Sequence, residues 1–226
     1  MKLVIFDCDG TLVDSQHAIV AAMDRAYAAV GLAAPSRARV LSIVGLSLPE
    51  VFQVLAPEQP AATRRALAEH YKATFKGAGA PPVERDPLFP GARAVVDALA
   101  KRDDIALGIA TGKSLRGVHR LFDQQGWHSH FATVQTADGH PSKPHPSMIR
   151  AAIAETGCEP RATVMIGDTT FDMEMARAAG VTAIGVAWGY HPADALARAG
   201  AHEIVAAFED LAGVLETRLG NGKGRR

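Results

Sequence analysis

The chain has 226 residues, 48% of them hydrophobic, and a formal net charge of zero at pH 7. This length allows one or two domains with a sizeable core, and the balanced charge gives no overall attraction for nucleic acid or an anionic membrane. No stretch reaches the roughly 18 uncharged apolar residues of a membrane span, and the N-terminus lacks the pattern of a signal peptide.

Short apolar runs alternate with helical patterns along most of the chain. Strands are predicted at residues 3–6, 105–110, 131–134, 163–166 and 183–186. Helices are predicted at residues 91–101, 115–125, 146–156, 171–179 and 193–199. This alternation is typical of βαβ units and predicts an α/β fold with a parallel sheet covered on both faces.

One segment, between Ser15 and about Pro82, lacks this alternation. Its apolar residues recur at helical spacing, and no convincing strand is found in it. It closes with GAGAPP, residues 77–82, which is typical of a connection. We therefore predict an all-helical domain of residues 15–82, inserted after the first strand of an α/β core made of residues 1–14 and 83–226.

Polar residues gather where the predicted strands end. In open α/β sheets, ligands bind beyond the carboxyl ends of the strands. The residues at such positions, or close to them in the sequence, are Asp7, Asp9, Thr111, Gly112, Lys143, Asp168 and Asp172. Each has an ordinary alternative explanation, such as a turn, a helix N-cap or a solvated lysine. The whole set, in this order, favours a binding site.

The chemistry of these residue types suits a phosphate ester. An ionised Asp7 is a competent nucleophile, and aspartyl-phosphate intermediates are an established covalent route. Its negative charge repels a phosphate, so a cation is needed. Asp7 and Asp168 together suit Mg²⁺, which binds carboxylate and phosphate oxygens, and Lys143 adds a second positive charge.

The other residues have separate tasks in this hypothesis. Asp9, when protonated, can give its proton to the leaving oxygen and later take one from the attacking water. Thr111 can donate its hydroxyl to a phosphate oxygen, and the backbone N–H groups that follow it, from Gly112 onward, lie near a helix start, where anions are favoured.

At these residues the sequence resembles the haloacid dehalogenase superfamily of phosphohydrolases over nearly the whole chain. The matching stretches are FDCDGTLVDS, ATGKS, SKPHPSM and MIGDTTFDMEMARAAG. The resemblance implies a Rossmann-like core, and a small helical cap for the insert. It implies Asp7 as nucleophile and Asp9 as general acid/base.

The resemblance also assigns the ligands. It implies Thr111 and Lys143 as phosphate ligands, and Mg²⁺ held by Asp7, Asp168 and the backbone carbonyl of Asp9. Asp172 would support the metal site. The expected substrate is a small-molecule phosphate ester, and the expected state is a monomer or homodimer.

Within the superfamily, the presence of Asp9 argues against dehalogenases and phosphonatases, which lack the second aspartate. The run from LFPGARAVVDAL to VAWGYHPADAL is similar to phosphoglycolate phosphatases. Two alternatives stay open: a sugar-phosphate mutase resembling β-phosphoglucomutase, and a non-catalytic module that binds a phosphorylated ligand. Arg37, Arg39 and residues 45–47 are candidates for contact between cap and leaving group.

Several other residues invite different interpretations. GIATGKS has one residue too few for a P-loop, so we expect Lys113 to be solvated or near the phosphate site. His140 and His145 lack the spacing of zinc ligands and are predicted as loop residues. Two distant cysteines without metal spacing, Cys8 and Cys158, favour a reducing compartment, and we expect a cytoplasmic protein.

Trp188 and Tyr190, in AWGYH, could line the edge of the pocket or pack against the sheet. We predict packing.

Overall fold

The computed structural model describes residues 1–75 and 87–219. The predicted connection at residues 77–82 and the basic residues at the C-terminal end lie outside these ranges. Among the described residues, no helix combines the length and the apolar character that a membrane crossing requires.

The centre of the molecule is a six-stranded parallel sheet in the order β3-β2-β1-β4-β5-β6. Its strands are β1 (Lys2–Phe6), β2 (Ile105–Thr111), β3 (Phe131–Thr136), β4 (Thr163–Gly167), β5 (Thr182–Val186) and β6 (Glu203–Val205). The predicted parallel α/β fold is therefore confirmed. Strand β6, at one edge, was not predicted, because three residues are too few to show alternation.

Helices cover both faces of the sheet, because the side chains of each buried strand alternate between the two faces. Val4 and Phe6 of β1 lie in the cluster packed by α5 (Ala92–Leu99), α6 (Leu115–Gln125) and α10 (Phe208–Leu219). Leu3 and Ile5 face α7 (Ser147–Thr156), α8 (Thr170–Ala179) and α9 (Ala193–Arg198). Helix α10 was not predicted from the sequence.

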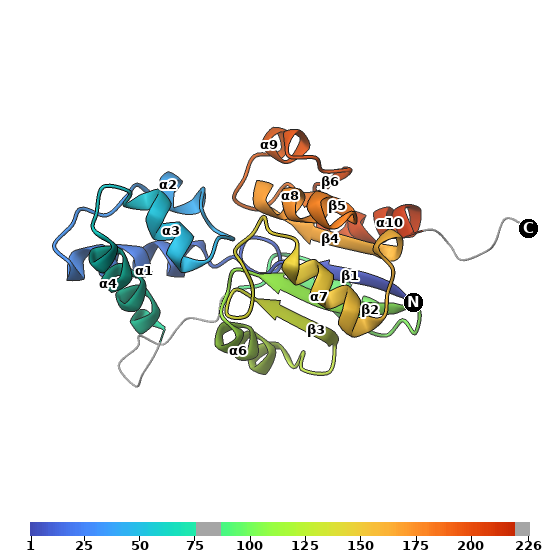
Figure 1. Cartoon of the computed structure of the whole chain (residues 1–226). Helices are drawn as coiled ribbons and strands as arrows, with labels where there is room; N and C mark the ends of the chain where they lie inside the picture. The colour runs from blue at the N-terminus through green and yellow to red at the C-terminus, as the bar shows by residue number, and fades with distance from the viewer. Residues whose placement is uncertain (76–86, 220–226) are drawn as a thin grey trace, which may run out of the picture.

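Four helices form a separate group after β1: α1 (Gln16–Ala29), α2 (Arg37–Leu41), α3 (Leu48–Leu55) and α4 (Ala61–Thr74). We call residues 15–75 the cap. Figure 1 shows the cap beside the end of the sheet toward which the strand arrows point. The cap has its own apolar cluster, which includes Met23, Phe52 and Leu67, and its described residues contain no strand, as expected. The exact division of the chain into two domains stays a prediction.

The two ends of the cap are joined by backbone pairing next to β1. The Asp14 N–H donates to the Pro87 carbonyl at 2.8 Å, and the Phe89 N–H donates to the Leu12 carbonyl at 3.0 Å. Between these bonds, Val13 forms an antiparallel bridge with Leu88. The chain therefore enters the cap and continues after it at one place.

The register of the central strands determines which residues meet beyond the sheet. Phe6, the last residue of β1, pairs with Ile109 of β2 and with Ile166 of β4. Asp7 therefore lies between the ends of these two strands, close to Thr111 on one side and Asp168 on the other. This edge of the sheet also faces the cap (Figure 1).

Candidate active site

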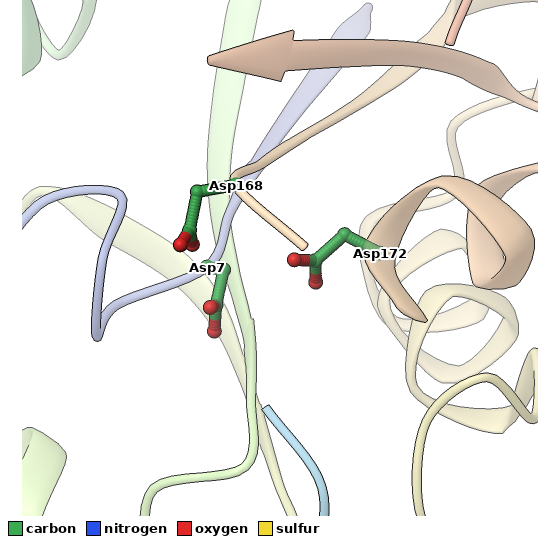
Figure 2. A group of neighbouring side chains, drawn as sticks. All are labelled: Asp7, Asp168 and Asp172. Atoms are coloured by element: carbon green, nitrogen blue, oxygen red, sulfur yellow. The ribbon is translucent and has the colours of Figure 1, made fainter. Parts of the chain in front are cut away.

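Three buried carboxylates converge at the carboxyl edge of the sheet. Asp7 follows β1, Asp168 follows β4, and Asp172 lies in the first turn of α8, with exposed fractions of 1%, 0% and 0%. Figure 2 shows the three side chains close to one another, with the carboxyl group of Asp172 directed toward the other two. One oxygen from each lies within 4.8 Å of the others, and the group is a candidate metal site. The structure thus brings together three of the carboxylates singled out in the sequence.

Lys143 places a positive charge among these acids. Its Nζ lies 2.9 Å from Asp7 Oδ1 and 2.6 Å from Asp172 Oδ1, and its side chain is fully buried. Burial disfavours the charged ammonium, but the two carboxylates outweigh this effect and raise the pKa of Lys143. Lys143 therefore remains charged, and the site carries one positive and three potential negative charges.

Neighbouring groups fix the orientation of Asp168 and Asp172. Thr11 Oγ1 donates to Asp168 Oδ1 at 2.9 Å, and the Tyr190 N–H donates to Asp168 Oδ2 at 2.8 Å. Asp172 accepts from the hydroxyl and the backbone N–H of Thr169, which in turn caps α8. Neither Thr11 nor the Tyr190 N–H was predicted from the sequence as part of the site. Thr11 could have been found, because it directly follows the DxDG motif. The Tyr190 N–H could not, because a backbone donor has no signal in the sequence.

The electrostatics of the site fit a divalent cation. Burial raises the pKa of Asp7 to about 6, although Lys143 opposes the shift, and burial with the charge of Asp7 raises the pKa of Asp168. Neither oxygen of Asp7 accepts a directed hydrogen bond. Hard, closely spaced carboxylate oxygens are what Mg²⁺ binds. Asp7 and Asp168, which follow the neighbouring strands β1 and β4, would hold the ion, and Asp172, engaged by Lys143 and Thr169, would support the site.

Asp9 lies apart from this cluster and has different neighbours. Ser15 Oγ donates to Asp9 Oδ1 at 2.7 Å, and Lys113 Nζ lies 2.6 Å from the same oxygen. The side chains of Asp9 and Lys113 are each 13% exposed. Of the two positions expected for Lys113, the structure has the one near the site. Ser15 was not anticipated as a partner of Asp9.

Thr111 and Gly112 form the third side of the site. Thr111 is 1% exposed, and its Oγ1 accepts from the Lys113 N–H at 3.2 Å, which leaves its hydroxyl hydrogen for another acceptor. A Cβ at Gly112 would lie 2.6 Å from the Gly45 carbonyl oxygen, so the cap backbone contacts the core here. Only glycine allows this approach.

Further contacts join the cap to the core around the site. The Ser47 N–H donates to Ser142 Oγ at 2.8 Å, next to Lys143 in the sequence. His191 Nδ1 accepts from the Thr170 N–H at 3.1 Å, so its Nε2 carries the hydrogen and donates to the Ser42 carbonyl at 3.2 Å. The cap is thus held over the carboxyl edge by polar contacts on two sides.

A cavity of about 890 Å³ lies between the cap and the core. Asp7, Asp9, Thr111 and Gly112 line its core side, and residues 45–47 line its cap side. Two of the cap candidates lie elsewhere: Arg37 donates to Gln16, and Arg39 donates to the Val54 carbonyl at 3.0 Å. Neither arginine lines the cavity.

The remaining polar candidates have structural partners. His140 lines the cavity and also bonds to Ser147 Oγ and Gln135 Oε1, both at 2.8 Å, and His145 accepts from the Ser147 N–H at 3.2 Å. Among the described residues, neither histidine belongs to the candidate metal site of Asp7, Asp168 and Asp172. Cys8 and Cys158 are free and buried, and burial raises the pKa of the Cys8 thiol far above its usual range. A thiolate nucleophile at Cys8 is therefore disfavoured.

The predicted packing against the sheet is confirmed for Trp188, whereas Tyr190 packs against the cap instead. The Trp188 ring lies 4.5 Å from that of Phe208, and its Nε1 donates to the Thr11 carbonyl at 3.0 Å. Tyr190 packs against the apolar cluster of the cap, and its hydroxyl lies 3.4 Å from Ser15 Oγ. Both aromatic residues therefore support the loop that follows β1, and neither lines the cavity.

Comparison with protein families gives a match over residues 4–186 to the family described as haloacid dehalogenase-like hydrolase. The "Probable phosphatase IndB" of Dickeya dadantii is 37% identical over 222 residues, which cover 96% of this chain and 94% of that protein. The phosphoglycolate phosphatase of Yersinia pestis is 31% identical over 216 residues, covering 92% of this chain and 90% of that protein.

Solved structures give the same fold. A hydrolase from Pseudomonas syringae superposes with a TM-score of 0.82 at 25% identity, covering 97% of this chain and 100% of that one. A haloacid dehalogenase-like family hydrolase from Streptococcus pneumoniae has a TM-score of 0.78 at 23% identity, covering 95% of this chain and 98% of that one. The second likeness concerns the fold alone.

Proposed function

Since the chain belongs to the haloacid dehalogenase-like hydrolases, we propose that it is a Mg²⁺-dependent phosphatase that hydrolyses a small-molecule phosphomonoester through an aspartyl-phosphate at Asp7. One observation carries this proposal. A buried carboxylate without a directed hydrogen bond lies beside a buried lysine, on the wall of the cavity between the cap and the core. Lys143 favours the ionised form of this carboxylate, which is the nucleophile, and the cavity gives a phosphate ester access to it.

In the first step, Asp7 attacks phosphorus and the P–O bond to the alcohol breaks. Lys143 stabilises the negative charge on the transferred group, as does a hydrogen bond from the Thr111 hydroxyl. The N–H groups near Gly112, ahead of α6, add further donors. Lys143 keeps its charge during this step because Asp172 remains 2.6 Å away.

Asp9 handles the proton in both steps. It donates a proton to the leaving alcohol oxygen and then accepts one from the water that attacks the aspartyl-phosphate. Its two contacts, with Ser15 and Lys113, both involve Oδ1, so Oδ2 is the oxygen that carries the proton. Giving up its proton leaves Asp9 as the carboxylate, beside the Lys113 ammonium at 2.6 Å, and in this form it takes a proton from the attacking water.

A bound Mg²⁺ would neutralise the charge that repels the phosphate from the carboxylates. Asp7 and Asp168 are the proposed side-chain ligands, with the Asp9 backbone carbonyl as the third group that the family pattern implies. Asp172 supports the site through Lys143 and Thr169.

The names of the relatives suggest phosphoglycolate as one candidate substrate. A mutase of sugar phosphates uses the same four motifs, and a module that only binds a phosphorylated ligand keeps the same scaffold. Retention of every motif carboxylate argues against the module. Two free cysteines agree with action in the cytoplasm, as a monomer or homodimer.

The test is phosphate release, measured with Mg²⁺ and with EDTA, from 2-phosphoglycolate, β-glucose 1-phosphate, a nucleoside monophosphate and p-nitrophenyl phosphate. Asp7→Asn is the variant, and Asp103→Asn, at an exposed aspartate outside the cavity, is the matched control. We expect metal-dependent release that disappears in Asp7→Asn and persists in the control. Full activity of Asp7→Asn would refute the covalent route, and isomerised glucose phosphate without free phosphate would indicate the mutase.

A further inference from the structure

The cavity has two chemically different walls. The core wall carries the motif residues, whereas the cap wall is built mainly from apolar side chains. The apolar residues of the cap that line the cavity include Ile19, Met23, Ile43, Val44, Leu48 and Val51. They come from α1, from α3 and from the segment that joins α2 to α3, so the apolar wall is continuous over several elements.

The polar groups of the cap wall are already satisfied. Ser47 Oγ donates to the Glu50 carboxylate, and Lys72 pairs with Glu69 at 3.0 Å with 45% of its side chain exposed. Glu50 also lines this wall, and its charge repels a carboxylate. Among the described residues of the cap, the lysine that lines the cavity, Lys72, is already paired with an acid, so this wall does little to favour a small anionic alcohol such as glycolate.

The size of the cavity points the same way. Its volume of about 890 Å³ lies within the roughly 300–1,000 Å³ of clefts that enclose drug-sized ligands. A phosphate and two carbon atoms would fill little of it and would leave the rest of the space beneath the cap to water. An apolar leaving group would displace that water and gain the free energy of burial.

Apart from Lys72, the described lysines and arginines that line the cavity lie on the core wall. Lys113 pairs with Asp9, Arg116 is exposed, and the Arg120 guanidinium lies 5.8 Å from the ring centre of Phe75. These groups lie in or just ahead of α6, on the same side as the phosphate-binding motif. They suit the phosphoryl end of a substrate. The core wall would therefore bind the anionic end of the substrate, and the cap wall would bind its apolar end.

We propose that the preferred substrate is the phosphate monoester of an alcohol with an extended apolar body, which the cap wall binds. This inference rests on the proposed phosphatase activity. The specificity determinants are then Ile19, Val44, Leu48 and Val51, acting through the shape and the apolar character of the wall that they form. Turnover should rise with the length of the apolar chain until the chain fills the space beneath the cap.

The experiment compares kcat/KM for ethyl, butyl and hexyl phosphate with that for 2-phosphoglycolate, in Mg²⁺. Full burial of a methylene group corresponds to about a fourfold gain, so we expect hexyl phosphate to exceed ethyl phosphate by at least about tenfold. Equal values along the series, or a preference for 2-phosphoglycolate, would overturn the inference. No metal-dependent release from any ester would instead refute the proposed activity.

A second set of measurements tests whether the preference for longer alkyl chains arises in the cap. Ala18 of α1 lines the cavity and is partly exposed, so Ala18→Phe fills space without removing core contacts. Ala28→Phe, at an exposed position of the same helix, is the matched control. We expect Ala18→Phe to lower the ratio of hexyl to ethyl turnover by about tenfold or more and the control to leave it unchanged. An unchanged ratio in Ala18→Phe would overturn the inference.

Discussion

Replacing Lys143 with methionine tests how the buried charges of the site are balanced. In the folded protein its ammonium lies 2.9 Å from Asp7 and 2.6 Å from Asp172, with no exposed side-chain surface. Removing one partner of a buried ion pair costs about 3–5 kcal/mol, because the remaining charge stays buried and uncompensated. Lys143→Met therefore leaves three buried carboxylates with no cation among them.

The measurement is the free energy of unfolding in urea, in EDTA, at pH 7.5 and at pH 5. With a slope of about 2–3 kcal/mol per molar urea, the expected loss lowers the midpoint by about 1–2 M at pH 7.5. The pKa of Asp7 is raised to about 6. Its carboxyl is therefore protonated at pH 5 and ionised above pH 6, so the attraction to Lys143 is present only at the higher pH. The loss should accordingly be smaller at pH 5.

Lys72→Met is the matched control, because Lys72 forms an exposed ion pair with Glu69. Exposed pairs of this kind contribute about 0–1 kcal/mol, so the control should unfold within about 0.5 M urea of the unchanged protein. If Lys143→Met were as stable as the control at pH 7.5, Lys143 would not stabilise the carboxylates. An equal loss at both pH values would refute the assignment of the raised pKa to Asp7.

Three further predictions concern the same site. Mg²⁺ should raise the thermal midpoint more at pH 7.5 than at pH 5 in calorimetry, because a proton on Asp7 competes with the ion below pH 6; an equal shift at both pH values would remove Asp7 as a ligand. Asp9→Ala should lower kcat for an alkyl phosphate by about 10²–10⁴-fold, and an unaffected rate would exclude the proton-transfer role. Gly112→Ala should reduce turnover by displacing the Gly45 carbonyl of the cap. Gly139→Ala is the control and should not, because there is open space around Gly139. Equal rates of the two variants would show that the contact between Gly112 and Gly45 is dispensable.

The arrangement of the candidate site was largely predictable, because parallel strands end at a common edge. Asp7 and Asp168 each follow an apolar run, and the register of β1 with β4 brings them together. Asp172 was anticipated from its distance of one helical turn from Asp168. These positions depend only on strand periodicity and on the rule that ligands bind at carboxyl ends.

Other features depend on the docking of segments far apart in the sequence, and no local pattern indicates them. The pairing of Lys113 with Asp9 joins residues 104 positions apart, and Ser47 meets Ser142 only because the cap lies against the core. The arginines at positions 37 and 39 were chosen for their charge alone, and helix packing directs both away from the cavity. Specificity in the cap was therefore the least predictable part.

The chain enters and leaves the cap at one place, and this affects how far the stability of the core depends on the cap. Because Val13 bridges Leu88, the segment between them is a loop whose ends are fixed by the core itself. The entropic cost of closing such a loop grows only slowly with its length. We therefore expect the sheet to tolerate replacement of the whole cap by a short linker, or by another cap, with little loss of stability. The catalytic scaffold and the element that selects the substrate are in this sense exchangeable modules.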